Sequence, residues 1–210
     1  MRYPLSPNPI FWTLAGEKHL VGQQMVFIRL AGCSVGCAQC DTDYRVDSRA
    51  SVEEIVARAC AVTPLEDRDC WAWITGGEPT DHDLRPLLRG LRAAGFATAV
   101  ATSGVRRMNE ILCDWISVSP HSTDPGRFIQ RLGHEITLCE GLNGLDLDAW
   151  YAAWPDDKTD FMHRYVQPLW VGPPETGHED RASLARCLEF LRRHPRWALS
   201  RQNHKHWGVP

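Results

Sequence analysis

The chain has 210 residues, with 23 Lys and Arg against 26 Asp and Glu, and its formal net charge is −3. This length fits one domain with a sizeable core, whereas two domains would be cramped. The slightly negative net charge argues against sequence-independent binding of nucleic acid. No apolar run approaches the ~18 residues that a membrane span requires. We therefore expect a single domain, residues 1–210, that binds neither nucleic acid nor a membrane.

Strand-like apolar runs alternate with helix-like stripes along the chain. In the first half of the chain, the pattern predicts a strand at Met25–Leu30, a helix after the capping box Ser51-Val-Glu-Glu54, a strand at Trp71–Ile74 and a helix through Leu84–Leu91 that Asp81 or Asp83 caps. Next come a strand at Ala97–Ala101, a short helix through Met108–Leu112 and strands at Trp115–Ser119 and Ile136–Cys139. The last predicted elements are a helix around Leu147–Trp154, a strand ending at Tyr165–Val166, a helix at Ser183–Arg193 and a strand at Trp197–Ser200. Such alternation is typical of a parallel sheet covered by helices. Because about six strands are too few for a closed eight-stranded barrel, the predicted fold class is α/β, a partial (open) parallel β/α barrel.

Three cysteines lie in one short run, Cys33-Ser-Val-Gly-Cys37-Ala-Gln-Cys40, directly after the first predicted strand. Three thiolates on one loop can hold three irons of a [4Fe–4S] cluster and leave the fourth iron open for chemistry. The alternatives are a zinc site, although no fourth Cys or His follows just downstream, and cysteines buried as small hydrophobes. Eight cysteines in a chain without an opening signal peptide indicate a reducing, cytoplasmic location rather than a disulfide framework.

Polar loops follow the next predicted strands. These are Thr75-Gly-Gly-Glu-Pro79, Thr102-Ser-Gly104 and Ser119-Pro-His121. Ligands gather at the carboxyl ends of the strands in open α/β sheets, so we expect these loops and the cysteine loop to surround one site. By itself, Gly-Gly-Glu-Pro is an ordinary turn.

With the cysteine loop after the first strand and Gly-Gly-Glu-Pro after the second, the chain resembles the radical S-adenosylmethionine (radical SAM) enzymes. The resemblance implies that Cys33, Cys37 and Cys40 ligate the cluster and that SAM chelates the open iron. The Gly76–Glu78 edge would orient the methionyl part of SAM, with Gly77 as the closest backbone approach. Reductive cleavage of SAM would then release a 5′-deoxyadenosyl radical, which requires a site that excludes water.

Further segments narrow the resemblance to the 7-carboxy-7-deazaguanine synthases. They are Cys40-Asp-Thr42, the stretch Ile10–Glu17 (F-x-T-L-Q-G-E-G in that family), Phe27–Cys33, Ser119-Pro120, Gln167-Pro168 and the tail Leu199–Lys205 with Gly208–Pro210. The resemblance implies a radical, Mg²⁺-dependent ring contraction of 6-carboxy-5,6,7,8-tetrahydropterin to 7-carboxy-7-deazaguanine, with loss of ammonia, in queuosine or 7-deazapurine biosynthesis. It also implies a homodimer and a reductant such as flavodoxin.

Site residues can be carried over from the family one by one. Thr42 would place its hydroxyl on Mg²⁺. The residues expected to bind SAM are Gln39, Cys40, Asp41, Gly77, Ser119, Pro120 and His121. The residues expected to bind the pterin are Leu14, Ala15, Gly16, Glu17, Arg29, Thr75, His204 and Pro210, the last through its free carboxylate. Arg29 suits a substrate carboxylate because a guanidinium forks onto two oxygens.

Departures from the family pattern cluster in the pterin pocket. Ala101 stands where the family has a glutamate that would bind the amino-pyrimidine edge, and Ala15 replaces a glutamine. His121 and Thr137 stand where the family shows lysines. The chain is therefore either a divergent synthase with compensating contacts, for which Glu17, Glu78, Glu135 and Glu140 are candidates, or a paralogue acting on a related heterocycle. A glycyl-radical activase and a zinc-binding relative are the remaining alternatives.

Overall fold

The computed structural model of the chain describes residues 1–38, 40, 42–63, 70–109, 112–173 and 175–209. Its centre is a nine-stranded sheet with the order β11-β8-β7-β6-β5-β4-β2-β1-β3. The strands are β1 (Arg2–Leu14), β2 (Gln24–Leu30), β3 (Ser48–Ser51), β4 (Trp71–Gly76), β5 (Ala97–Thr102), β6 (Trp115–Val118), β7 (Leu132–Glu140), β8 (Asp160–Pro168) and β11 (Ala198–Leu199). A separate hairpin consists of β9 (Trp170–Val171) and β10 (His178–Glu179).

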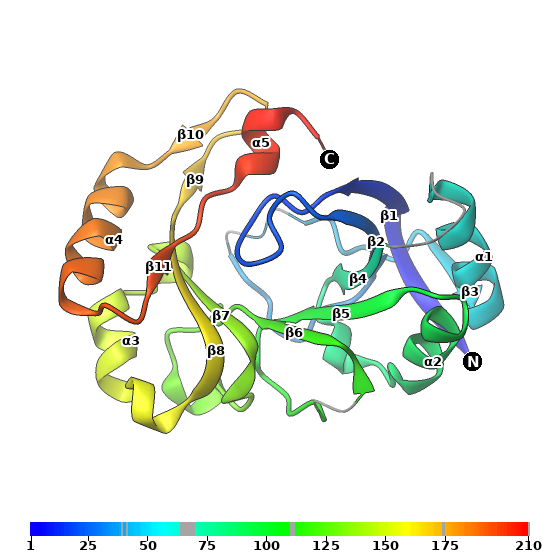
Figure 1. The fold of residues 1–210 in the computed structure, drawn as a ribbon, viewed down its shortest axis with the longest axis horizontal. Coiled ribbons are helices and arrows are strands. Elements are labelled where there is room, and N and C mark those ends of the chain that lie inside the picture. Colours follow the sequence, from blue (N-terminus) through cyan, green and yellow to red (C-terminus); the bar gives the residue numbers. More distant parts are fainter. Residues whose placement is uncertain (39, 41, 64–69, 110–111, 174, 210) are drawn as a thin grey trace.

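The predicted open parallel barrel is confirmed. Every neighbouring pair from β2 through β4, β5, β6, β7 and β8 to β11 is parallel. The sheet curves without closing, and the helices α1 (Val52–Val62), α2 (Arg85–Ala93), α3 (Leu147–Ala153) and α4 (Arg181–Arg193) lie on its outer side, as Figure 1 shows. The last helix, α5 (Asn203–Trp207), lies instead at the mouth of the barrel.

The strands β1 and β3, which the sequence pattern does not predict, extend the sheet in antiparallel fashion. The β1 segment contains three prolines, which cannot donate to a ladder and normally indicate an edge or a turn. The structure accommodates them because the register of β1 against β2 shifts between Leu5 and Ile10, and Asn8 takes a positive φ of 47° there. A bulge therefore allows a proline-rich segment to serve as an inner strand.

Local signals place most helices correctly. The Ser51–Glu54 capping box forms in both directions at the start of α1. The expected cap of α2 is wrong: Leu84 is the N-cap residue, and Asp83 accepts a hydrogen bond from the backbone N–H of Arg85 (3.1 Å). The expected helix at Met108–Leu112 falls partly outside the described residues. Met108 itself is irregular, because its N–H donates to Gln130 Oε1 (2.7 Å) rather than to a helical carbonyl.

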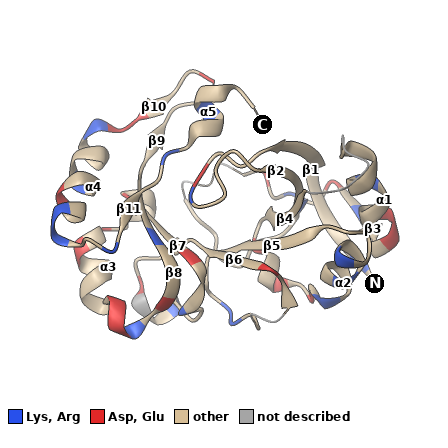
Figure 2. Cartoon of the chain, viewed as in Figure 1, with Lys and Arg blue, Asp and Glu red and all other residues tan. Residues whose placement is uncertain are grey.

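Two apolar layers hold the sheet. The larger one lies between the strands and the outer helices and includes Ile28, Ile74 and Leu88. The smaller one lies on the opposite face of the sheet around Met25 and Trp73, which alternate along their strands with residues of the larger one. Figure 2 shows that many of the charged residues lie on the outer helices. None of the helices in the described ranges has the length and apolar character needed to cross a lipid bilayer.

The loop of residues 15–23, between β1 and β2, lies inside the curve of the sheet near α5 (Figure 1). The chain closes this loop on itself through Ala15 N–H to the Gln23 carbonyl and Gly22 N–H to the Ala15 carbonyl, both 2.8 Å. The C-terminal segment adds a bond from Asn203 N–H to the Gly16 carbonyl (2.9 Å). Segments from both ends of the chain thus meet at the barrel mouth.

Candidate active site

The cysteine loop is held in place by a residue that sequence reasoning assigned to a helix cap. Asp81 accepts hydrogen bonds from Ser34 N–H (2.8 Å) and from the Ser34 hydroxyl (2.7 Å). Arg106 donates to the same carboxylate at 2.8 Å. Burial alone would raise the pKa of Asp81, but the hydrogen bonds from Ser34 and Arg106 lower it below its usual value. Asp81 therefore stays ionised and anchors the loop next to Cys33.

The Gly-Gly-Glu-Pro turn packs directly against the start of the cysteine loop. Gly77 N–H donates to the Leu30 carbonyl (2.9 Å), and Glu78 N–H donates to the Gly32 carbonyl (3.0 Å). A Cβ on Gly77 would lie 1.7 Å from the Gly32 carbonyl oxygen, and one on Gly76, where φ is +113°, would lie 2.0 Å from that of Leu30. The contact between these two loops therefore already requires both glycines, before any ligand is considered.

Glu78 joins the turn to the loop after β5. Its side chain is buried and accepts from the Thr102 hydroxyl (2.7 Å), from Ser103 N–H (2.8 Å) and from the Ser103 hydroxyl (2.5 Å). Thr80 donates to it through both its N–H (3.1 Å) and its hydroxyl (2.7 Å). Because both of its oxygens accept hydrogen bonds from the protein, Glu78 stabilises the loops around the site. It is therefore not a candidate to replace the glutamate that the family has at position 101.

The three thiols of the motif line one cavity of about 540 Å³. Burial raises the pKa of Cys37; the Asn143 side chain lowers it, and the nearby Cys40 and Cys33 raise it further. The thiols are thus close enough to influence one another. Three cysteines of a [4Fe–4S] cluster bind three different irons, so three thiols in the wall of one cavity are a suitable donor set for that cluster.

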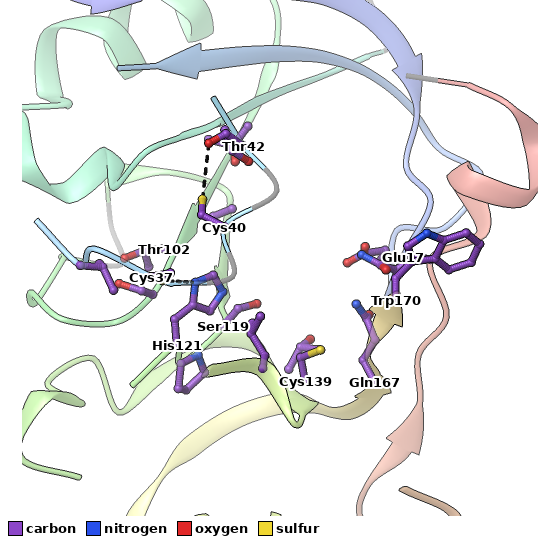
Figure 3. A pocket seen from close by; sticks show the side chains of 18 of the residues that line it. Glu17, Cys37, Cys40, Thr42, Thr102, Ser119, His121, Cys139, Gln167 and Trp170 are labelled. Atoms are coloured by element: carbon purple, nitrogen blue, oxygen red, sulfur yellow. Dashed lines mark hydrogen bonds between the residues drawn. The ribbon is translucent and has the colours of Figure 1, made fainter. Parts of the chain in front are cut away.

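The residues expected to bind SAM line the same cavity. Figure 3 shows Cys37, Cys40 and Thr42 on one side of it, across from Glu17, Gln167 and Trp170. The predicted SAM contacts among the described residues that line it are Cys40, Gly77, Ser119, Pro120 and His121. His121 Nδ1 lies 3.5 Å from Cys37 Sγ. Gln39 and Asp41, also expected to bind SAM, lie outside the described residues.

A second, adjoining cavity of about 240 Å³ collects the residues expected to bind the pterin. They are Leu14, Ala15, Gly16, Glu17, Arg29, Thr75 and His204. A Cβ on Gly16 would lie 2.3 Å from the His204 ring, so this glycine is what lets the C-terminal segment approach. Glu17 Oε1 lies 3.9 Å from His204 Nδ1. Pro210 lies outside the described residues.

The two cavities meet at a shared wall. Six residues line both: Glu17, Lys18, Thr42, Thr75, Ala101 and Gln202. Thr42, the expected Mg²⁺ ligand, therefore lies between the cysteine side and the predicted pterin side. The structure brings together every described residue of the predicted site, and their individual roles stay predictions.

Ala101, where the family has a glutamate, lies at this shared wall, and Thr137 and His121 line the larger cavity. Among the candidates to compensate, Glu140 bonds Arg186 and Leu147 N–H instead. Glu135 accepts from His19 N–H (3.3 Å) and lines neither cavity. Glu17 is the acidic candidate that lines the cavity of the predicted pterin residues.

Sequence reasoning missed Lys18, Asp81 and the structural role of Glu78. Lys18 lines both cavities. Its signal in the sequence is that it stands where the family stretch F-x-T-L-Q-G-E-G has its last glycine. Asp81 and Glu78 carry no comparable signal, because the loop residues that they hold, Ser34 for Asp81 and Thr102 and Ser103 for Glu78, are 24 to 47 residues away.

No family model matches the chain. Among curated proteins, it is 33% identical to a 7-carboxy-7-deazaguanine synthase of Burkholderia multivorans, over 96% of this chain and 97% of that protein. It is 31% identical to the enzyme of the same name from Bordetella pertussis, over 98% and 99% of the two chains. For the Escherichia coli K12 enzyme of that name, the identity is 29% over the full length of both chains.

Solved structures give the same result. QueE from Escherichia coli superimposes with a TM-score of 0.70 at 28% identity, covering 97% of this chain and 95% of that one. A radical SAM methyltransferase from Sphaerobacter thermophilus has a TM-score of 0.54 at 17% identity, covering 85% and 66% of the two chains. The second likeness is one of fold alone.

Proposed function

This chain belongs to the 7-carboxy-7-deazaguanine synthase family, and on that premise we propose that it converts 6-carboxy-5,6,7,8-tetrahydropterin to 7-carboxy-7-deazaguanine with loss of ammonia. The observation that carries the proposal is the shared wall between the two cavities. The cysteine thiols line one cavity, and Arg29, Glu17 and His204 line the other. A radical made on the first side can therefore reach a substrate held on the second.

The cluster and SAM would be held by residues already in position. Cys33, Cys37 and Cys40 would ligate the cluster, and the Gly77 edge with Ser119–His121 would hold SAM. When bound, the cluster and SAM would together supply radical chemistry that can exchange one hydrogen atom with the substrate. The protein must orient the substrate and exclude water during that exchange. The contact of the C-terminal segment with Gly16 suits both tasks, because it places Gln202 and His204 in the wall of the smaller cavity.

Magnesium fits the shared wall through the Thr42 hydroxyl. A hard cation needs several oxygen ligands, and the substrate carboxylate and water would supply those that Thr42 does not. We further propose that residues 1–210 act as one domain with substrate-pocket segments near both ends. Electrons would come from a reductant such as flavodoxin, and the enzyme would work as a cytoplasmic homodimer.

A second candidate is a radical SAM paralogue that acts on a related heterocycle. Ala101 at the shared wall favours it, because an alanine cannot accept the hydrogen bonds of an amino-pyrimidine edge. Losing such a charge-assisted acceptor costs about 1.5–3 kcal/mol of binding free energy. Glu17, which lines the same cavity, supports the synthase instead.

Anaerobic reconstitution with iron, sulfide, a reductant, SAM, Mg²⁺ and 6-carboxytetrahydropterin tests the proposal. We expect a brown protein, SAM cleavage that depends on the reductant, and a product with the absorbance and mass of 7-carboxy-7-deazaguanine. Cluster formation and SAM cleavage without that product would favour the paralogue. A colourless protein that leaves SAM intact would exclude both candidates.

A further inference from the structure

Lys18 has a backbone conformation that does not suit its side chain. Its φ is +63°, and the other described non-glycine residues with positive φ are the asparagines Asn8 and Asn143. Asparagine tolerates the left-handed region, whereas lysine has no local interaction that offsets the crowding of its Cβ. The family pattern has glycine at this place. A side chain kept against its backbone preference points to a use for that side chain.

The backbone around Lys18 is fixed from two directions. Lys18 N–H donates to the Ser200 hydroxyl (3.1 Å), and the next residue, His19, donates its N–H to Glu135 Oε2 (3.3 Å). The partners come from the C-terminal segment and from β7, respectively. The loop is therefore held to the barrel wall, and the position of the backbone from which the Lys18 side chain extends is fixed.

The ammonium group of Lys18 reaches the carboxyl end of β6. It donates to the Ser117 hydroxyl (3.1 Å) and to the Ser119 hydroxyl (3.2 Å). Both acceptors are neutral, and within the described part of the chain no carboxylate forms an ion pair with Lys18. A half-buried cation that has only neutral partners attracts an anion more strongly than a paired one does.

Two buried polar atoms lie in the wall of the same cavity without a protein partner. They are Thr137 Oγ1 and Gln167 Oε1, on side chains that are 3% and 5% exposed, respectively. Thr137 is two residues beyond Glu135, which is paired with Ser117 across β6 and β7. Buried polar groups are nearly always hydrogen-bonded, so these two atoms indicate that a polar ligand completes the wall.

We propose that Lys18 is the cation that binds a ligand carboxylate where the two cavities meet, with the Thr137 hydroxyl as a second donor. The inference rests on the proposed function, which brings one carboxylate, that of SAM, to the larger cavity and another, that of the substrate, to the smaller one; Lys18 lines both cavities. Position 18 then determines affinity for that ligand in this chain, in a way that a family member with glycine there does not share.

The test compares three variants of reconstituted enzyme. Lys18→Met removes the charge and keeps the length, Lys18→Arg keeps a charge, and Lys18→Gly removes the charge while relieving the positive φ. The control is Lys158→Met, an exposed lysine in the short turn Asp156–Lys158, outside both cavities. Binding of SAM alone and of the pterin in the presence of SAM is measured by calorimetry, and thermal unfolding is followed for each variant.

We expect Lys18→Met and Lys18→Gly to raise one of the two dissociation constants by at least about tenfold, with Lys18→Arg and Lys158→Met within about threefold of wild type. A change in the SAM constant identifies SAM as the source of the carboxylate, and a change in the pterin constant identifies the substrate. Lys18→Gly should melt at the wild-type temperature or above it, which separates lost binding from lost folding.

The inference is overturned if both constants stay within about threefold of wild type in Lys18→Met and Lys18→Gly, or if Lys18→Arg loses as much affinity as Lys18→Met. These results are distinct from a failure of the proposed function. In that case the wild-type enzyme itself would form no deazaguanine, while the SAM measurement would still report on Lys18.

Discussion

Glu78 Oε1 lies 2.7 Å from the Thr102 hydroxyl, which donates a hydrogen bond to it, so one buried carboxylate ties the loop after β4 to the carboxyl end of β5. The other oxygen of Glu78 binds Ser103 through its N–H and hydroxyl. The Gly77 edge and the Thr102–Gly104 loop are consequently positioned relative to each other by protein contacts alone. The site is preorganised at this point.

Replacing Glu78 should therefore weaken both the fold and the site. Glu78→Ala leaves several buried donors without an acceptor, and we expect the free energy of unfolding to fall by about 3 kcal/mol. Urea unfolding of the cluster-free protein measures this. Glu189→Ala, on the exposed face of α4, is the control and should change the free energy by less than about 0.5 kcal/mol. Equal effects of the two changes would show that the Glu78 network does not stabilise the fold.

Only the three cysteines of the motif Cys33–Cys40 should be needed to bind iron. Serine at Cys33, Cys37 or Cys40 should reduce bound iron from about four per chain to well below one, because in the proposed site each thiolate would bind its own iron. Cys60→Ser changes a half-buried cysteine of α1 and should keep the full iron content. Iron and acid-labile sulfide analysis after anaerobic reconstitution gives the answer. A motif variant that retains a full cluster would contradict the assignment.

Thr42 should determine the response to magnesium. Thr42→Val keeps the shape and removes the hydroxyl, so the Mg²⁺ concentration for half-maximal turnover should rise by about tenfold or more. Thr42→Ser keeps the hydroxyl and should respond to Mg²⁺ nearly as wild type does. Turnover measured across a magnesium titration distinguishes the two variants. If valine and serine behave alike, the Thr42 hydroxyl is not a ligand.

Ala101 and Lys18 should act together. Ala101 is paired with Ser117 across β5 and β6, and Ser117 accepts a hydrogen bond from Lys18. In Ala101→Glu the new carboxylate is therefore drawn to the Lys18 ammonium, whereas in the double variant with Lys18→Gly it is available to the pterin. We expect kcat/KM of the double variant to exceed that of either single variant, with a coupling free energy of about 1 kcal/mol or more. Strictly additive effects would disprove the link between the two positions.

Stability should fall on mild acidification because of His163. Burial lowers the pKa of His163 below 6.5, and the neighbouring His19 lowers it further; the two rings stack with centroids 3.8 Å apart. The folded state binds the proton on His163 less well than the unfolded chain does. The contribution of neutral His163 to the free energy of unfolding is therefore complete above pH 6.5, and it is lost as the pH falls towards the depressed folded-state pKa.

Urea unfolding of the cluster-free protein at pH 7.5 and pH 5.5 tests this effect. His163→Phe keeps a ring against Trp115 and should lose less free energy of unfolding between the two pH values than wild type does. His178→Gln, at an exposed position of β10, should keep the wild-type difference. An unchanged pH dependence in His163→Phe would rule out this histidine as the cause.

Much of the site could be predicted from the sequence because its parts follow directly from local patterns. The apolar runs at β2, β4, β5 and β6 are short, and each ends in a polar loop. Parallel strands bring their carboxyl ends to one edge, and this rule alone places Cys33, Thr75 and Ser119 around one cavity. The capping box at Ser51 is equally local and forms as expected.

Other features depend on contacts between distant parts of the chain. Strand β1 forms despite its prolines because β2 and β3 pair with it on both sides. Asp81 holds Ser34, 47 residues away, and Lys18 reaches Ser119, 101 residues away. Neither pairing leaves a periodic or spaced pattern in the sequence, because each residue looks like an ordinary loop residue in its own neighbourhood.

By itself, the sequence determined the class of chemistry and the α/β barrel. Both follow from local patterns, because the three thiols are closely spaced in the chain and each strand is followed directly by its loop. Only the tertiary structure decided which polar groups stay paired with protein and which face the cavity. Glu78 is fully occupied, whereas the Lys18 ammonium, Thr137 Oγ1 and Gln167 Oε1 lie at the wall of the cavity. The physical reason is that hydrogen-bond partners are set by the packing of strands far apart in the chain, which no local pattern records.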